Sequence, residues 1–156
     1  AIPAEMKQVA RLLGGETLRD VEDRVESSIA LLKGKVPDRA ILRALHFVDE
    51  DRRVREMLTA LKNDDLASFF DGVIASGESS WMLLQNLFVP GGDNQEMPLA
   101  LEMSRRMLTG RGAWRIHGGG FAGTALCIVP EEKLSAFCRE LETHLAPGCC
   151  HRLQIR

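Results

Sequence analysis

Four glycines lie within six positions of this chain, at Gly118, Gly119, Gly120 and Gly123. Glycine adopts positive φ freely and lets a backbone approach a ligand closely, but four together cost conformational entropy and need a reason. Exposed N–H groups in such a turn can hold phosphate oxygens or support another phosphate-binding loop. A wide hairpin without a ligand explains the glycine count equally well. We call residues 118–123 the glycine loop.

The residues around the glycine loop exclude two known types of phosphate-binding loop and suggest possible ligand contacts. No Gly-Lys-Ser/Thr follows it and it enters a predicted strand, so it is neither a P-loop nor a dinucleotide-binding fingerprint. Arg111 and Arg115 favour anions, although a helix end and a strand surface explain them as well. His117 could hydrogen-bond a ligand or act as an acid or base, whereas a single histidine is more often structural.

Two other polar groups could carry chemistry. Residues 76–80 (Ser-Gly-Glu-Ser-Ser) interrupt a helical pattern, and a cap and turn explains them better than a ligand site. A zinc interpretation would use His144, Cys149, Cys150 and His151. However, Pro147-Gly148 breaks the geometry and adjacent cysteines on a strand point to opposite faces, so we predict no metal site. No nucleophile with a neighbouring base is evident, and the chain displays no complete catalytic site.

Most of the first 110 residues are predicted to be helical, because apolar side chains recur there at spacings of three and four. The first predicted helical segment carries an apolar stripe at Leu18, Val21, Val25, Ile29 and Leu32. A second, long helix is capped by Asp38 and reaches Asn63. A third helix is capped by Asp64 or Asp65 and is weakened or ended by Gly77, and a fourth helix covers about residues 96–108. In the third helix, we expect Leu66, Phe69, Phe70, Val73 and Ile74 to face a core.

From residue 113 the apolar period changes to two, which predicts strands on either side of the glycine loop. Residues 125–129 are apolar throughout, and we expect them to form a central strand covered on both faces. A helix over 131–145 and a last strand over 150–155 follow. The chain is therefore predicted to form an α+β domain.

Composition excludes several classes of protein. The 156 residues are 45% hydrophobic and 27% charged, which suits one globular domain. A net charge of -2 gives no case for binding nucleic acid or an anionic membrane. No apolar stretch approaches the roughly 18 to 20 residues that span a bilayer, and the start is not a signal peptide. The four cysteines are not spaced as a disulfide framework, so we expect a cytoplasmic protein.

Three segments together resemble the galactokinases of the GHMP small-molecule kinase superfamily. Residues 115–123 (Arg-Ile-His-Gly-Gly-Gly-Phe-Ala-Gly) are similar to the third motif of that family, usually close to R-M-T-G-G-G-F-G-G. Residues 43–54 resemble its R-A-x-H-x-x-x-E-x-x-R-V segment, and 78–80 fall where its helix carries Ser-His or Ser-Gly. The ending, 150–156, is similar to galactokinase-like proteins of Gram-positive bacteria. The matches cover about residues 40–156.

The resemblance implies an activity and roles for residues. Galactokinases transfer the γ-phosphoryl group of ATP to the anomeric hydroxyl of galactose, with Mg²⁺, in a cleft between two domains. Their third motif lies on the C-terminal domain, where it supports the phosphate-binding loop and lines the cleft. By resemblance, that role falls here to Gly118, Gly119, Gly120, Phe121 and Gly123. The possible substrate or anion contacts are Arg115, His117, Glu78, Ser79 and Ser80.

The resemblance also implies that this chain is only the C-terminal part of such a kinase, with a small, mainly antiparallel sheet against a large helical layer. Residues 1–36 would be a leading helical segment and 37–156 the core of a single domain. Nothing matches the sugar-binding signature, the P-x-x-x-G-L-S-S-S loop for ATP or the catalytic aspartate of the N-terminal half. Phosphoryl transfer depends on such groups, so we expect no activity from this chain by itself.

The glycine-rich segment differs from the galactokinase motif at two positions. His117 replaces the usual Thr of the motif, and Ala122 replaces a Gly and restricts φ there. The expected partner is the missing N-terminal domain, and the surface that would meet it should promote self-association. The alternative is a non-enzymatic module that binds a ligand or partner through the glycine loop and the helical face.

Overall fold

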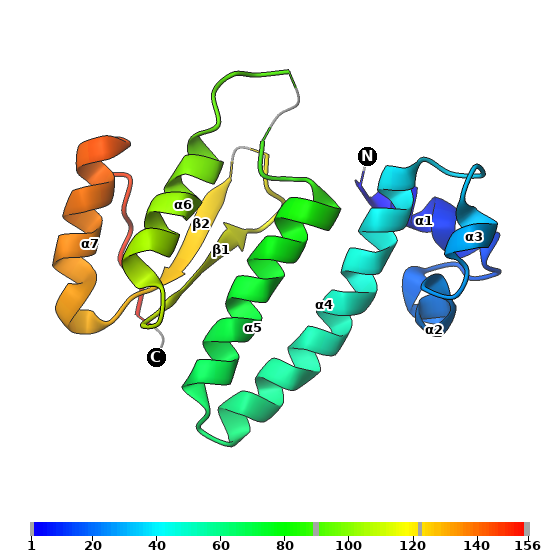
Figure 1. Ribbon diagram of the computed structural model, residues 1–156, viewed down its shortest axis with the longest axis horizontal. Helices are drawn as coiled ribbons and strands as arrows, with labels where there is room; N and C mark the ends of the chain where they lie inside the picture. The colour runs from blue at the N-terminus through cyan, green and yellow to red at the C-terminus, as the bar shows by residue number, and fades with distance from the viewer. Residues whose placement is uncertain (1, 89–90, 122, 155–156) are drawn as a thin grey trace. The chain divides into compact units, whose positions relative to one another are not determined.

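The computed structural model describes residues 2–88, 91–121 and 123–154 (Figure 1). The chain divides into two compact units, residues 1–85 and residues 86–156. The α+β fold expected from the sequence is confirmed: helices dominate, and the described strands form a two-stranded antiparallel sheet. None of the helices in the described ranges has both the length and the apolar character needed to cross a membrane.

The first unit is helical. Its elements are α1 Ile2–Leu12, the 3-10 helix η1 Leu18–Val21, α2 Glu22–Val25, α3 Ile29–Leu32, α4 Asp38–Lys62, α5 Leu66–Ser79 and the π-helix η2 Ser80–Leu84. The apolar stripe predicted over 18–32 is broken into three short helices, and its Ile29 is exposed while the other four members are buried. Ser27 Oγ donates to Arg24 O at 3.2 Å, which shows how serine competes with helical hydrogen bonds at this break.

The pair of α4 and α5 forms a helical hairpin (Figure 1). The bounds of α4 match the prediction, but Pro37 is its N-cap residue and Asp38 is its first helical residue. Asp65 caps α5 as expected, since its side chain accepts from Ser68 N at 3.0 Å. The residues expected to face a core from α5 are confirmed only in part. Val73 is buried as expected, but Leu66 is exposed.

The third helix does not end at Gly77, whereas a weakening of the helix by this glycine stays a prediction. Helix α5 runs through Gly77 and continues directly as η2. A glycine costs a helix about 1 kcal/mol, which packing of a buried turn outweighs. The helical path ends at Gln85, whose φ of 58° lies in the left-handed region.

The second unit contains the sheet. Its elements are α6 Glu96–Leu108, β1 Ala113–His117, β2 Thr124–Ile128 and α7 Glu131–His144. The two strands pair from Ala113 with Ile128 to His117 with Thr124, and α6 contacts both strands and α7 (Figure 1). Leu108 of α6 packs with Phe137 and Leu141 of α7, which buries the apolar stripe predicted for 131–145.

Two expectations about the sheet are wrong. β2 is paired on one side only and is half-buried, so it is not a central strand covered on both faces. Residues 150–154 form no strand, and Ile155 lies outside the described residues. The tail instead lies along α7 through side-chain contacts, with Arg152 donating to Ser135 Oγ at 3.3 Å. Cys150 packs against the apolar cluster of α6 and α7, whereas residues 151–154 are exposed, so the apolar pattern predicted a strand that does not form.

Candidate functional site

The glycine loop connects β1 to β2 at the end of the hairpin, and left-handed backbone dominates it. Gly118 and Gly120 have φ of 71° and 77°, which glycine adopts without strain. Phe121 also lies in the left-handed region, with φ of 63°, and for a bulky side chain this costs about 1–2 kcal/mol. Contacts elsewhere in the second unit must therefore hold the loop in this shape.

Asn86, which the sequence analysis did not single out, makes those contacts. Its backbone oxygen accepts from Phe121 N at 2.6 Å, and its Nδ2 donates to Gly119 O at 3.4 Å. A Cβ added at Gly120 would lie 2.1 Å from Asn86 O, so only a glycine fits there. Asn86 is 1% exposed, and it fixes both neighbours of Gly120. No local pattern around Asn86 could have indicated this role.

The outer side of the glycine loop is open. Gly118 and Gly119 are exposed, and a Cβ added at either would meet nothing within 4 Å. The N–H groups of these two residues donate to no other residue in the described ranges. Gly123 is also exposed, and Ala122 lies outside the described residues. Exposed amides in a glycine-rich turn are suited to phosphate oxygens.

The flanking candidates differ in their environment. Arg115 is half-buried, and its Nε donates to the oxygen of the next residue, Ile116, at 2.9 Å. His117 ends β1 opposite Thr124 and is exposed. His117 therefore lies directly before the loop, where its ring is open to solvent.

The other candidates belong to the first unit. Glu78 is exposed, whereas Ser79 and Ser80 are buried, at 8% and 2% exposure. The Ser79 hydroxyl lies 2.8 Å from Nδ1 of buried His46. Within the first unit, Ser79 therefore makes a polar contact between α5 and α4.

The R-A-x-H-x-x-x-E-x-x-R spacing places its polar positions on one face of α4, since steps of three and four follow the helical repeat. Arg43 Nε donates to Leu84 O at 3.1 Å, and its Nη1 pairs with Glu5 at 2.5 Å. Further along this face, Glu50 accepts from Ser76 Oγ at 2.6 Å and pairs with Arg53. In this unit the motif connects α4 to α1, α5 and η2.

Glu5 is the acidic centre of this buried contact. The hydrogen bond from Arg39 lowers the pKa of its carboxyl, and Arg43 lowers it further, against a smaller rise from burial. Arg43 is almost fully buried, while Arg39 is half exposed. The ionised carboxylate therefore satisfies two guanidinium groups in very different surroundings.

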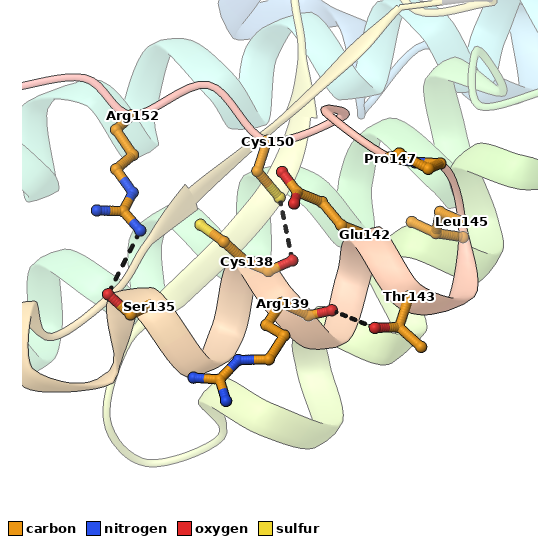
Figure 2. A pocket seen from close by; sticks show the side chains of 9 residues that line it. All are labelled: Ser135, Cys138, Arg139, Glu142, Thr143, Leu145, Pro147, Cys150 and Arg152. Atoms are coloured by element: carbon orange, nitrogen blue, oxygen red, sulfur yellow. Dashed lines mark hydrogen bonds between the residues drawn. The ribbon is translucent and has the colours of Figure 1, made fainter.

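An open pocket of about 550 Å³ lies between α7 and the C-terminal tail (Figure 2). Cys150 Sγ approaches Cys138 O at 3.9 Å, and burial together with nearby Cys138 raises the pKa of Cys150 to about 12. A thiol with such a pKa is not a nucleophile at neutral pH. No three His, Cys, Asp or Glu side chains of the described ranges are grouped to hold a metal ion.

Comparison with known proteins points to one kind of enzyme. The chain is 31% identical over 134 residues to a galactokinase of Glaesserella parasuis, covering 85% of this chain and 33% of that protein. It is 31% identical to a galactokinase of Actinobacillus pleuropneumoniae, covering 83% and 32%. The chain is similar to galactokinases. It spans about a third of the length of these relatives. No family model matches the chain.

A solved structure extends this similarity to the fold. The crystal structure of Lactococcus lactis galactokinase complexed with galactose matches with a TM-score of 0.73 at 21% identity. The match covers 90% of this chain and 35% of that protein. The expected GHMP-kinase-like α+β fold is therefore confirmed. The relatives in sequence are Pasteurellaceae proteins, so the expected closeness to Gram-positive proteins is not supported by them.

Proposed function

We propose that this chain is the C-terminal part of a galactokinase-like sugar kinase. The complete enzyme transfers the γ-phosphoryl group of ATP to the anomeric hydroxyl of galactose. The observation that carries the proposal is the 31% identity over 85% of this chain to a galactokinase of which it spans only 33%. In the complete enzyme, residues 1–156 act as a single domain, with 1–36 leading into the core at 37–156. An ATP-dependent kinase of this kind works in the cytoplasm.

The glycine loop is the contribution of this chain to the site. Phosphoryl transfer is accelerated mainly by positioning and by groups that stabilise charge on the phosphoryl oxygens. The exposed amides of Gly118 and Gly119 support this role, because they are open and donate to no other described residue. Phe121 and Gly123 line the cleft beside them. Arg115 and His117, which flank the loop, contact the anion or the sugar.

The rest of the catalytic groups belong to the N-terminal part of the complete enzyme. By the similarity to galactokinases, we assign to that other part the site for Mg²⁺, the main loop for ATP and the catalytic aspartate. When bound, Mg²⁺ would neutralise charge on the phosphates. The isolated chain lacks these groups and is expected to be inactive.

A coupled kinase assay with ATP, Mg²⁺ and galactose tests this function. The assay is run on this chain alone, on the N-terminal part of the Glaesserella parasuis galactokinase alone, and on their mixture. We expect phosphorylation only in the mixture. Full turnover by this chain alone would contradict the assignment to a partial enzyme. An inactive mixture of two folded samples would instead favour a non-enzymatic module that binds a ligand or partner.

Self-association is the second expected behaviour of the isolated chain. Val54, Leu58 and Leu61 form an exposed apolar stripe along the second half of α4, and Leu66 at the start of α5 is exposed as well. Exposed apolar patches of this kind promote association. Light scattering should show dimers or larger species as concentration rises, and Leu58→Gln should reduce their size while Lys62→Gln should not. A strict monomer at high concentration would speak against this surface.

A further inference from the structure

We infer that Asn86 is the positioning residue of the glycine loop: it holds residues 118–121 in the conformation that leaves Gly118 and Gly119 exposed, with their amides unbonded to other described residues and available to phosphate. The inference rests on the proposed function, because it assigns those amides to the phosphates of ATP. Asn86 lies outside residues 115–123, the segment whose resemblance to galactokinases concerns this loop.

The contacts of Asn86 enclose one glycine. Its backbone oxygen binds the N–H of Phe121, and its side-chain Nδ2 binds the carbonyl of Gly119. Gly120, between these two bonds, is pressed against Asn86 so closely that an added Cβ would lie 2.7 Å from Nδ2. One buried residue therefore fixes three consecutive residues of the loop.

The loop has little else to hold it. Within the described ranges, the bond from Phe121 N to Asn86 O is the one backbone hydrogen bond made by residues 118–121 outside the strands. The backbone of Phe121 lies in the left-handed region, which is unfavourable for a phenylalanine unless other contacts hold it there. Weakening the contacts of Asn86 should therefore release Phe121 and change the direction of the neighbouring amides.

The polarity of Asn86 also requires a reason. Its Oδ1 is buried and accepts no hydrogen bond from the described residues. An unsatisfied buried acceptor destabilises a fold, and an apolar side chain of similar size would avoid it. Among the described residues, the one polar contact that this side chain makes is the bond to the glycine loop. An asparagine here is therefore explained by its Nδ2 donor.

Two variants of nearly unchanged size test this role. Asn86→Leu and Asn86→Asp both remove the Nδ2 donor and leave the backbone bond to Phe121 possible, and Asn94→Leu on an exposed segment is the control. In the isolated chain, amide hydrogen exchange of Phe121 should become about fivefold faster in both variants, the factor for one hydrogen bond. In the active mixture, KM for ATP should rise about fivefold while kcat and KM for galactose stay within about twofold.

The outcomes separate this inference from the proposed function. If the amide hydrogen exchange of Phe121 is unchanged in both variants, the proposed role of Asn86 is wrong. If neither variant folds, the role is also wrong, because Asn86 then serves the overall stability of the chain. Faster exchange with an unchanged KM for ATP would overturn its link to phosphate. An inactive wild-type mixture would reject the proposed function and with it that link, and Phe121 exchange would still decide whether Asn86 holds the loop.

Discussion

Replacing Gly120 with alanine should destabilise the chain more than any other alanine substitution in the glycine loop. The new Cβ would lie 2.1 Å from a backbone oxygen, and alanine would have to adopt a φ of 77°. Left-handed strain and overpacking together predict a loss of about 3 kcal/mol, or a Tm lower by roughly 6–12 °C. Thermal unfolding followed by circular dichroism measures this change.

Neighbouring glycines provide matched controls. Gly119 has open space around it and no positive φ, so Gly119→Ala should change stability by less than about 0.5 kcal/mol. Gly118 has open space but a φ of 71°, so Gly118→Ala should cost about 1 kcal/mol from backbone strain alone. Equal Tm values for the variants at 119 and 120 would show that the contact with Asn86 does not form in solution.

Replacing Arg43 with methionine should destabilise the first unit by about 3 kcal/mol, because one partner of a buried ion pair is removed and Glu5 loses a donor. The Leu84 carbonyl loses a donor as well. Arg39 pairs with the same carboxylate but is half exposed, so Arg39→Met should cost far less. Urea unfolding of the two variants gives the comparison, and equal losses would contradict the role of burial.

The same carboxylate predicts a dependence on pH. The pKa of Glu5 is lowered in the folded chain from its ordinary value of 4.5, so the unfolded chain binds the proton more tightly. The stability that Glu5 contributes is therefore present above pH 4.5 and is lost as pH falls through the lowered folded pKa. Glu5→Gln should be less stable than the wild type at neutral pH, and the difference should shrink on acidification. A difference that stays constant with pH would contradict the ion pair.

Local signals in the sequence determined much of this structure. The bounds of α4, α6 and the two strands follow from hydrophobic period and from glycine or proline at the ends, because these depend on neighbours within a few residues. The spacing of Arg43, His46 and Glu50 likewise placed them on one helix face. The cluster of glycines marked the loop itself and its need for unusual backbone.

Tertiary structure decided what those signals could not. Gly77 does not end its helix, since the cost of a glycine is small beside the packing of a buried turn. The tail at 150–154 contacts α7 through Cys150 and Arg152 without joining a sheet, because alternation of side chains does not by itself supply a partner strand. Asn86 reaches the glycine loop across 33 residues of sequence, and no local pattern encodes a contact at that separation. The sequence by itself therefore determined which residues form the loop, and only the folded chain decided which residue holds it in shape.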